Sequence, residues 1–176
     1  MNKQAIIQAL NENYQAFIAY ISGLSEEDYS YRHEGKWDAA RQLNHINLSV
    51  APLVQVYALP PAVIEKNFGR KKQTDRSYED LLRAYQGLLS AGGKAPSRFV
   101  PGEEEMPPRK EMLDQLSAML PKLCDLIENT SDDDLDSLLI PHPLLKLLTL
   151  REMLYNAIYH VTHHQKQIET YLAQKA

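Results

Sequence analysis

Apolar side chains recur along this chain at alternating steps of three and four residues, which is the period of an amphipathic helix. The first such segment covers residues 3–22 and ends before Gly23, a residue type that favours the position after a helix end. A second helix is predicted in WDAARQLNHI, where Asp38 is a good N-cap. The apolar face of the first helix is expected to consist of Ile7, Leu10, Tyr14, Phe17 and Ile21.

The second helix carries a proline inside its apolar pattern. Pro52 lacks a backbone N–H and is expected to kink the helix, and Pro60-Pro61 is expected to end it. A shorter helix follows, with a capping-box-like start at Ser77 and an end at Gly92-Gly93. Two stretches, residues 62–76 and the proline-rich KAPSRFVPGEEEMPPR, are predicted to be connections.

Two further long helices complete the pattern. One lies in KEMLDQLSAMLPKLCDLIEN, and the last begins at Thr149, because Thr149 and Glu152 form a T-x-x-E capping box, and runs to Leu172. No segment shows the alternation of apolar and polar residues that is typical of a strand. The sequence therefore predicts an all-α protein, a four-helix bundle with an additional short helix and a long crossover loop, as a single domain over residues 1–176.

Charge and composition narrow the class of protein. The chain has 176 residues and a net charge of -4, so the clustered cations of a nucleic-acid-binding surface are not expected. The basic run Arg70-Lys71-Lys72 is followed closely by Asp75 and indicates a solvated loop. No segment approaches about 18 consecutive apolar residues, and the N-terminus lacks the apolar core of a signal peptide. We therefore expect a cytoplasmic protein without nucleic-acid or membrane partners.

A few isolated residues carry candidate chemistry. Cys124 is the single cysteine, and it lies between apolar residues at helical spacing, so a buried hydrophobe is favoured over a catalytic thiol. Tyr14 could reach a pocket from the inner face of the first helix, although a packing role is favoured. Three carboxylates are candidate pocket acids, with a solvated surface position favoured for each: Glu12, Glu34 and Asp38.

Three of the six histidines lie within YHVTHHQKQI, residues 159–168. On a helical wheel of about 100° per residue, His164 falls inside the apolar stripe of the last helix and His160 at its edge. These two residues are an i, i+4 pair, which is a common half of a metal site because both imidazoles can reach one point. The alternative is two unrelated histidines, each hydrogen-bonded to a neighbour. His163 lies about 100° from His164 and is expected on the surface.

A metal site needs at least one further ligand. His45 lies at the margin of the apolar stripe of the second helix, about 100° from Ile46 on the wheel, where it could reach a polar pocket between helices. The alternative for His45 is a boundary histidine that makes one hydrogen bond. His33 and His142 are on predicted loops.

Two motifs of the chain resemble those of the DinB/YfiT-like superfamily. The first reads KWDAARQLNHI here, and the second reads HPLLKLLTLREMLYNAIYHVTHHQKQI. Each motif alone is weakly specific, whereas their order and spacing match the family over nearly the whole chain. The sequence departs from the family near Lys146, where a glycine often seen in the His-Pro loop is replaced, and after His164, where Gln-Lys stands in place of Arg-Gly.

The resemblance implies a bundle in which three histidines bind one divalent metal ion, commonly zinc or nickel. Matched position by position, the ligands are His45, His160 and His164, whereas His163 falls on no ligand position. The resemblance also implies a pocket over the metal and, frequently, a homodimer. Three neutral histidines leave at least one coordination position open, which is typical of a catalytic rather than a structural metal.

Characterised relatives of this kind are thiol S-transferases and a thiol-dependent isomerase, in which the metal activates a low-molecular-weight thiol. The resemblance therefore implies a metal-dependent thiol S-transferase that acts on small electrophiles, with a small-molecule substrate and a low-molecular-weight thiol as its partner. Two alternatives stay open, a metal-dependent hydrolase and a non-catalytic metal- or ligand-binding stress protein. A role in DNA repair is disfavoured by the acidic charge balance. No general base is identifiable, so the catalytic residues are unknown at this point.

Overall fold

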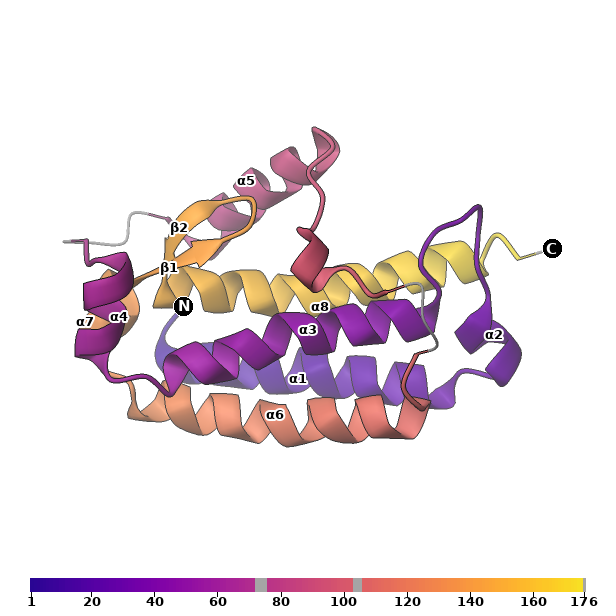
Figure 1. The fold of residues 1–176 in the computed structure, drawn as a ribbon, viewed down its shortest axis with the longest axis horizontal. Coiled ribbons are helices and arrows are strands. Elements are labelled where there is room, and N and C mark those ends of the chain that lie inside the picture. The colour runs from indigo at the N-terminus through magenta and orange to yellow at the C-terminus, as the bar shows by residue number, and fades with distance from the viewer. Residues whose placement is uncertain (72–75, 103–105, 176) are drawn as a thin grey trace.

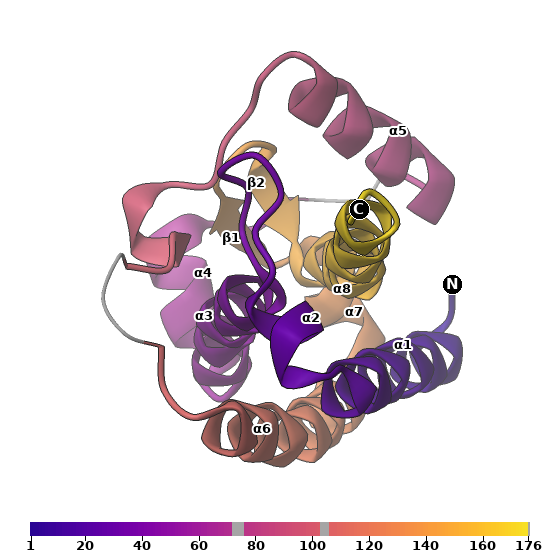
Figure 2. The same ribbon diagram turned by 90° about the vertical axis from the view of Figure 1, so that its right-hand side faces the viewer.

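A computed structural model describes residues 1–71, 76–102 and 106–175 of the chain. Its four long helices lie side by side along the long axis of the molecule (Figure 1): α1 (Lys3–Gly23), α3 (Ala39–Tyr57), α6 (Arg109–Asn129) and α8 (Leu150–Leu172). Helices α1 and α8 run in one direction and α3 and α6 in the other. The view along the bundle shows the four helices around a common interior (Figure 2). The predicted all-α four-helix bundle is confirmed.

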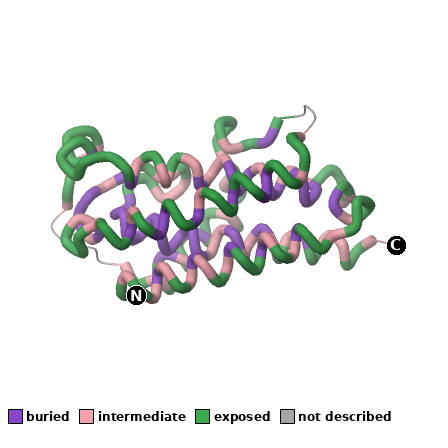
Figure 3. The backbone as a smooth tube through the Cα atoms, turned by 90° about the horizontal axis from the view of Figure 1, so that it is seen from below, coloured by how far each residue is buried: buried purple, intermediate pink, exposed green. Residues whose placement is uncertain are grey.

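The apolar stripes of the four helices meet in the bundle interior, and buried residues follow their inward faces (Figure 3). In α1 the buried face begins at Ile6, which is 0% exposed, whereas Ile7 is half-buried. The predicted stripe is therefore wrong by one position, because a step of four residues to Leu10 fits a helix as well as a step of three. Cys124 is buried in α6, where burial raises the pKa of its thiol, as expected for a packing residue.

Two of the long helices, α3 and α8, begin where their capping residues predict. Asp38 caps α3, and Ser77 caps the shorter helix that begins at Tyr78. Each side chain accepts a hydrogen bond from the backbone N–H three residues later. Thr149 and Glu152 form the complete capping box at the start of α8. Pro52 lies inside α3 without ending it. These starts are set by local hydrogen bonds and could therefore be predicted from short sequence motifs.

The connection from α3 to α6 is the predicted long crossover, and it contains three helical segments: α4 (Pro61–Phe68), α5 (Tyr78–Ser90) and the 3-10 turn η1 (Ser97–Phe99). The expectation of a plain connection over residues 62–76 is wrong at its start. Pro61 occupies the first turn of α4, where its missing N–H removes no helical hydrogen bond. Lys72 of the predicted basic loop and residues 103–105 of the proline-rich loop lie outside the described residues.

Two short helices join the long ones, α2 (Glu26–Ser30) and α7 (Asp132–Ser137). The acidic run that begins at Asp132 forms the first turn of α7, where negative charge favours the helix N-terminus. Arg70 is exposed, as expected of its basic run, but it also pairs with Asp134 at 2.8 Å.

A small hairpin precedes α8, with β1 (Leu139–His142) antiparallel to β2 (Lys146–Thr149). No strand was expected here, because four-residue strands are too short for alternation to be recognised. His142 therefore ends a strand instead of lying in a loop. Lys146 has a φ of 64°, a left-handed conformation that favours glycine. A glycine near this position, which the resemblance implies, would adopt this conformation without strain.

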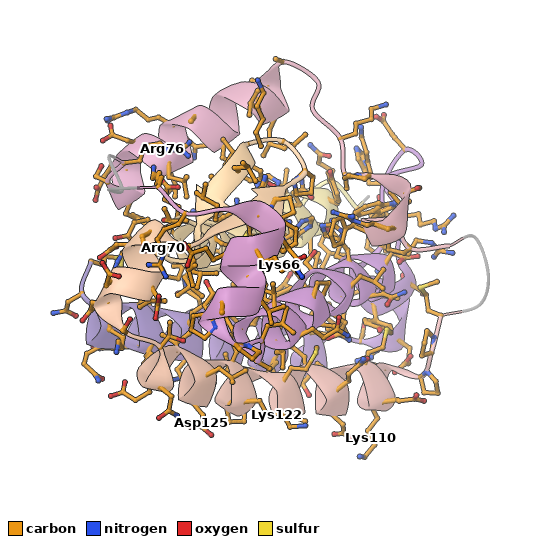
Figure 4. All side chains as sticks on the ribbon, turned by 60° about the vertical axis from the view of Figure 1, so that its left-hand side comes forward. Lys66, Arg70, Arg76, Lys110, Lys122 and Asp125 are labelled. Carbon is orange, nitrogen blue, oxygen red and sulfur yellow. The ribbon has the colours of Figure 1, made fainter. Side chains whose placement is uncertain are left out.

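The hairpin, α5 and α7 all pack against α8. Elsewhere the outer face of the bundle is charged, and Lys110, Lys122 and Asp125 point outward from α6 (Figure 4). Within the described residues, no single helix is long and apolar enough to cross a membrane. Helices α3 and α4 reach that length and composition only as a pair bent by 112°.

Candidate metal centre

Helices α3 and α8 bring three of the six histidines together. His45 comes from α3, whereas His160 and His164 come from consecutive turns of α8. His160 Nε2 lies 3.1 Å from His45 Nε2 and 3.0 Å from His164 Nε2. One nitrogen of each ring lies within 4.8 Å of a nitrogen of the other two. The convergence of His160 and His164 predicted from the helical wheel is therefore present in the fold, and His45 joins the pair as the resemblance implies.

These separations suit three ligands of one metal ion. Two nitrogens at the bond length of about 2.0–2.1 Å to a tetrahedral ion lie about 3.4 Å apart. Protons alone cannot satisfy the three facing nitrogens, because one proton serves only one nitrogen pair and leaves a further lone pair without a donor. The three histidines could therefore hold a divalent metal ion.

The outer nitrogens of two rings are held by the surrounding chain. His45 Nδ1 donates to the carbonyl oxygen of Phe99, 2.6 Å away, and His164 Nδ1 donates to the side-chain oxygen of Gln42. Because both partners are oxygen acceptors, the proton of each neutral ring is on Nδ1 and Nε2 keeps its lone pair. Hydrogen bonds of this kind orient the histidines of metal sites.

Burial keeps the three rings neutral. Desolvation lowers the pKa of His45, His160 and His164, because the low-dielectric surroundings disfavour an imidazolium. For His160 and His164, the neighbouring histidines lower the pKa further, since a second positive charge would be repelled. A neutral imidazole is the form that binds a metal ion, so burial favours the ligand state.

A cleft of about 1130 Å³ opens beside the three histidines, between α3, α8 and the segment that contains η1. Trp37 forms part of its wall, with its ring centroid 5.2 Å from that of His45. Most of the wall is apolar, which is usual for a small-molecule site. Within the described residues, the lysine and arginine side chains that line it are Lys36, Lys94 and Arg98, and no aspartate or glutamate accompanies them.

His163 is not one of the three converging histidines, as the wheel predicts. Its Nε2 lies 3.0 Å from Gln167 Nε2, and its ring packs on Tyr159 with centroids 5.7 Å apart. However, His163 is half-buried and lines the cleft, so the expectation of a surface residue is only partly met. His33 lies in a loop outside the cleft, with its ring stacked on Tyr171.

The candidate acids do not line the cleft. Glu12 and Glu34 are exposed, as expected. Asp38 is buried rather than solvated, and its carboxylate caps α3 and pairs with Arg41 at 2.7 Å. Tyr14 touches the cleft but is 2% exposed and donates to a backbone carbonyl of α8, and burial raises its pKa far above the usual value. The packing role of Tyr14 is thereby supported.

Sequence reasoning missed the groups that orient the site. Gln42 is recognisable as a polar residue one turn before His45, but nothing in the sequence indicates that it faces His164. Phe99 contributes a backbone carbonyl, which has no sequence signature. A further set of polar side chains lies on the cleft wall and consists of Tyr85, His142 and Asn156. Apart from the position of His142 in the His-Pro motif, nothing in the sequence indicates that these residues lie together.

Fold and site together define a helical-bundle protein with three converging histidines that could hold a metal ion. The model of one protein family, the DinB superfamily, matches residues 9–168. The chain therefore belongs to the DinB superfamily, and the resemblance seen in its two motifs is confirmed. No curated protein matches the chain.

Proposed function

We propose that this chain is a metal-dependent thiol S-transferase acting on small electrophiles, with one divalent ion, zinc or nickel, held by His45, His160 and His164. The observation that carries the proposal is the convergence of three Nε2 atoms of neutral rings on the wall of a cleft. Imidazole suits zinc and nickel alike. A divalent ion held by these three residues would lower the pKa of a bound thiol or water molecule and so supply a nucleophile at neutral pH.

The chain's own residues would support the reaction in two ways. The Phe99 carbonyl and the Gln42 side chain hold His45 and His164 with their lone pairs directed to a common point. The apolar wall, of which Trp37 is a part, would exclude water from the reacting atoms.

In the proposed transfer, the thiol sulfur forms a bond to an electrophilic carbon. The bond from that carbon to the leaving group breaks, and the leaving group departs with the electron pair. The thiol proton passes to solvent, since no carboxylate lines the described part of the cleft. Three cationic side chains line the wall: Lys36, Lys94 and Arg98. They would favour a substrate or leaving group that carries negative charge.

Metal content is the first test. The protein, purified without a histidine tag, is expected to carry one divalent ion per chain by elemental analysis, and His45→Ala is expected to lose it. His33→Ala is the matched control, because His33 is a histidine outside the cleft. Undiminished metal in His45→Ala would contradict the three-histidine site.

Turnover is the second test. Thiol consumption is measured with cysteine or 2-mercaptoethanol and an aryl halide, and it is expected to require metal and to vanish in His45→Ala. Metal-dependent cleavage of p-nitrophenyl acetate without thiol consumption would replace the transferase by a hydrolase. Bound metal with neither activity would favour a binding protein.

A further inference from the structure

A second set of polar side chains, His142, Asn156 and Tyr85, lies on the cleft wall beside the three histidines. The donor and acceptor of each hydrogen bond from the hairpin to Asn156 can be assigned. The set begins at the hairpin, where His142 Nδ1 lies 3.1 Å from the backbone nitrogen of Leu144 and 3.0 Å from that of Leu145. Both backbone N–H groups can only donate, so Nδ1 is an acceptor. The proton of the neutral His142 ring is therefore on Nε2.

His142 Nε2 in turn lies 3.3 Å from Asn156 Oδ1, and because it carries the proton it must be the donor. Burial lowers the pKa of His142 to about 4, so the ring stays neutral at physiological pH. Asn156 is 7% exposed and lies on α8 one turn before His160. With its oxygen engaged by His142, the orientation of the Asn156 amide is determined.

The amide nitrogen of Asn156 faces the hydroxyl oxygen of Tyr85 on α5. This contact slightly opposes the effect of burial, which raises the pKa of Tyr85 to about 12. The contact lacks the geometry of a regular hydrogen bond, and Asn156 Nδ2 has no other partner among the described residues. An amide nitrogen donates and does not accept hydrogen bonds, so Asn156 Nδ2 cannot take up the O–H of the phenol.

Tyr85 is placed between the hairpin histidine and the metal centre. Its ring packs edge-on against His142, with centroids 5.7 Å apart, and against His160, with centroids 6.5 Å apart. Tyr85, Asn156 and His160 all line the cleft. The phenol O–H of Tyr85 is therefore a hydrogen-bond donor on the cleft wall, from a ring that packs against His160.

We infer that Tyr85 is a substrate-binding residue that donates its O–H to a carbonyl or carboxylate oxygen of the small molecule bound beside the three histidines. Asn156 and His142 are positioning residues that orient this donor. The inference rests on the proposed function for the location of the reacting atom. It adds a substrate class, a thiol or electrophile with an oxygen acceptor a few atoms from the reacting atom.

The test compares two thiols of similar size, thioglycolate and ethanethiol, of which only the first has a carboxylate. Trp37 is the only tryptophan of the chain and lines the cleft, so its fluorescence reports binding to the zinc-loaded and the metal-free protein. Tyr85→Phe removes one oxygen atom. It is expected to weaken thioglycolate binding about tenfold and to leave ethanethiol and zinc affinities within about twofold.

Tyr159→Phe is the matched control. Tyr159 packs against Tyr85, with centroids 6.1 Å apart, and its hydroxyl accepts a hydrogen bond from Gln86. It does not line the cleft, so its variant is expected to bind both thiols as the wild type does. Methyl thioglycolate, which keeps the carbonyl without the charge, shows whether a neutral oxygen suffices.

The positioning residues are tested by coupling. His142→Leu is expected to weaken thioglycolate selectively, by about three- to tenfold, and to cause no further loss in the Tyr85→Phe background. A merely structural role of His142 would weaken both thiols and add to the effect of Tyr85→Phe.

Three outcomes overturn the role of Tyr85: an unchanged thioglycolate affinity in Tyr85→Phe, an equal loss for both thiols, or no thioglycolate binding to the wild-type protein. A wild-type protein that binds no zinc contradicts the proposed function instead. Selectivity in the metal-free titration would then still decide the role of Tyr85.

Discussion

The two halves of α8 bury polar side chains in different ways. In the first half, Leu150–Ile158, every residue is buried, and this includes Arg151 and Glu152. Each of these charges meets an opposite one. Arg151 Nη2 lies 2.6 Å from Asp132 Oδ1, and Arg76 Nε lies 2.9 Å from Glu152 Oε1. The charged groups of this half are satisfied within the protein itself, whereas Nδ2 of Asn156, on the cleft wall, has no hydrogen-bond partner among the described residues.

The second half, residues 159–172, buries only one face. The polar residues on that face do not pair with opposite charges. His160 and His164 face each other and His45 through nitrogen atoms that protons alone cannot satisfy. Buried polar groups normally find hydrogen-bond partners. Groups that converge without full satisfaction therefore mark a ligand site, whereas groups that neutralise each other mark a part of the fold. The predictions below test this difference.

The largest effect is expected from removing one converging histidine. His164→Ala should lower zinc affinity on the order of 10³-fold, because one of three ligand bonds is lost. The measurement is a competition titration against a chelator. His163→Ala, in the same helix and one residue away, is the control and should retain most of the affinity. Equal effects of both variants would show that convergence of the rings does not mark the metal ligands.

Breaking a satisfied pair in the first half should reduce stability instead. Glu152→Leu removes a carboxylate that is 0% exposed, together with its capping hydrogen bond to Thr149. The free energy of unfolding should fall by about 3 kcal/mol in urea titrations of the metal-free protein. Zinc affinity should stay within about threefold. The exposed Glu169→Leu on the same helix should change stability by less than about 0.5 kcal/mol.

A pH titration tests His142, a half-buried histidine whose Nε2 contacts Asn156 in the first half of α8. His142 has a pKa of about 4 in the folded protein, because burial disfavours its charged form, against about 6.5 in the unfolded chain. Between these values the unfolded chain binds a proton that the folded protein does not. Stability therefore falls as the pH decreases from about 6.5 to 4, by up to about 3 kcal/mol from this residue.

The variant His142→Gln removes this proton uptake. The slope of unfolding free energy against pH is proportional to the number of protons taken up on unfolding. In the metal-free protein this slope should decrease by the equivalent of about one proton over that range, measured by urea titrations at several pH values. An unchanged slope would show that His142 is not buried in its neutral form.

The smallest effect concerns the orientation of a histidine rather than the histidine itself. Gln42→Leu removes the acceptor of His164 Nδ1 and should weaken zinc binding by about 10–100-fold. Gln167→Leu is matched to it, because Gln167 contacts His163, which is not one of the converging residues. A chelator competition should show a loss for the first variant and none for the second.

Local motifs predicted the long helices well. The capping box of Thr149 and Glu152 defines the start of α8, because its two hydrogen bonds lie within three residues of each other. The hairpin and α4 were not predicted, since short elements of this kind are stabilised by the helices they pack against. Ile6 was missed in favour of Ile7, because the position of a neighbouring helix decides between adjacent candidates for one face.

The site, like the fold, was predicted from the sequence only as far as local patterns reach. The helix period alone places His160 and His164 one turn apart on one face. His45 was recognised at the margin of its stripe and by its motif, but its distance from the pair depends on how α3 packs against α8. The hydrogen bonds that Gln42 and Phe99 accept from His164 and His45 depend on the same packing, and no sequence motif indicates them.

The order of amino acids alone specifies where α3 and α8 begin and which histidines share a helix face, because caps and periodicity act over a few residues. The tertiary structure decides what those faces meet. It brings His45 to His160, and it joins His142, Asn156 and Tyr85 into one polar group on the cleft wall. The physical reason is that contacts between residues far apart in the chain depend on the packing of whole elements, which a local pattern does not contain.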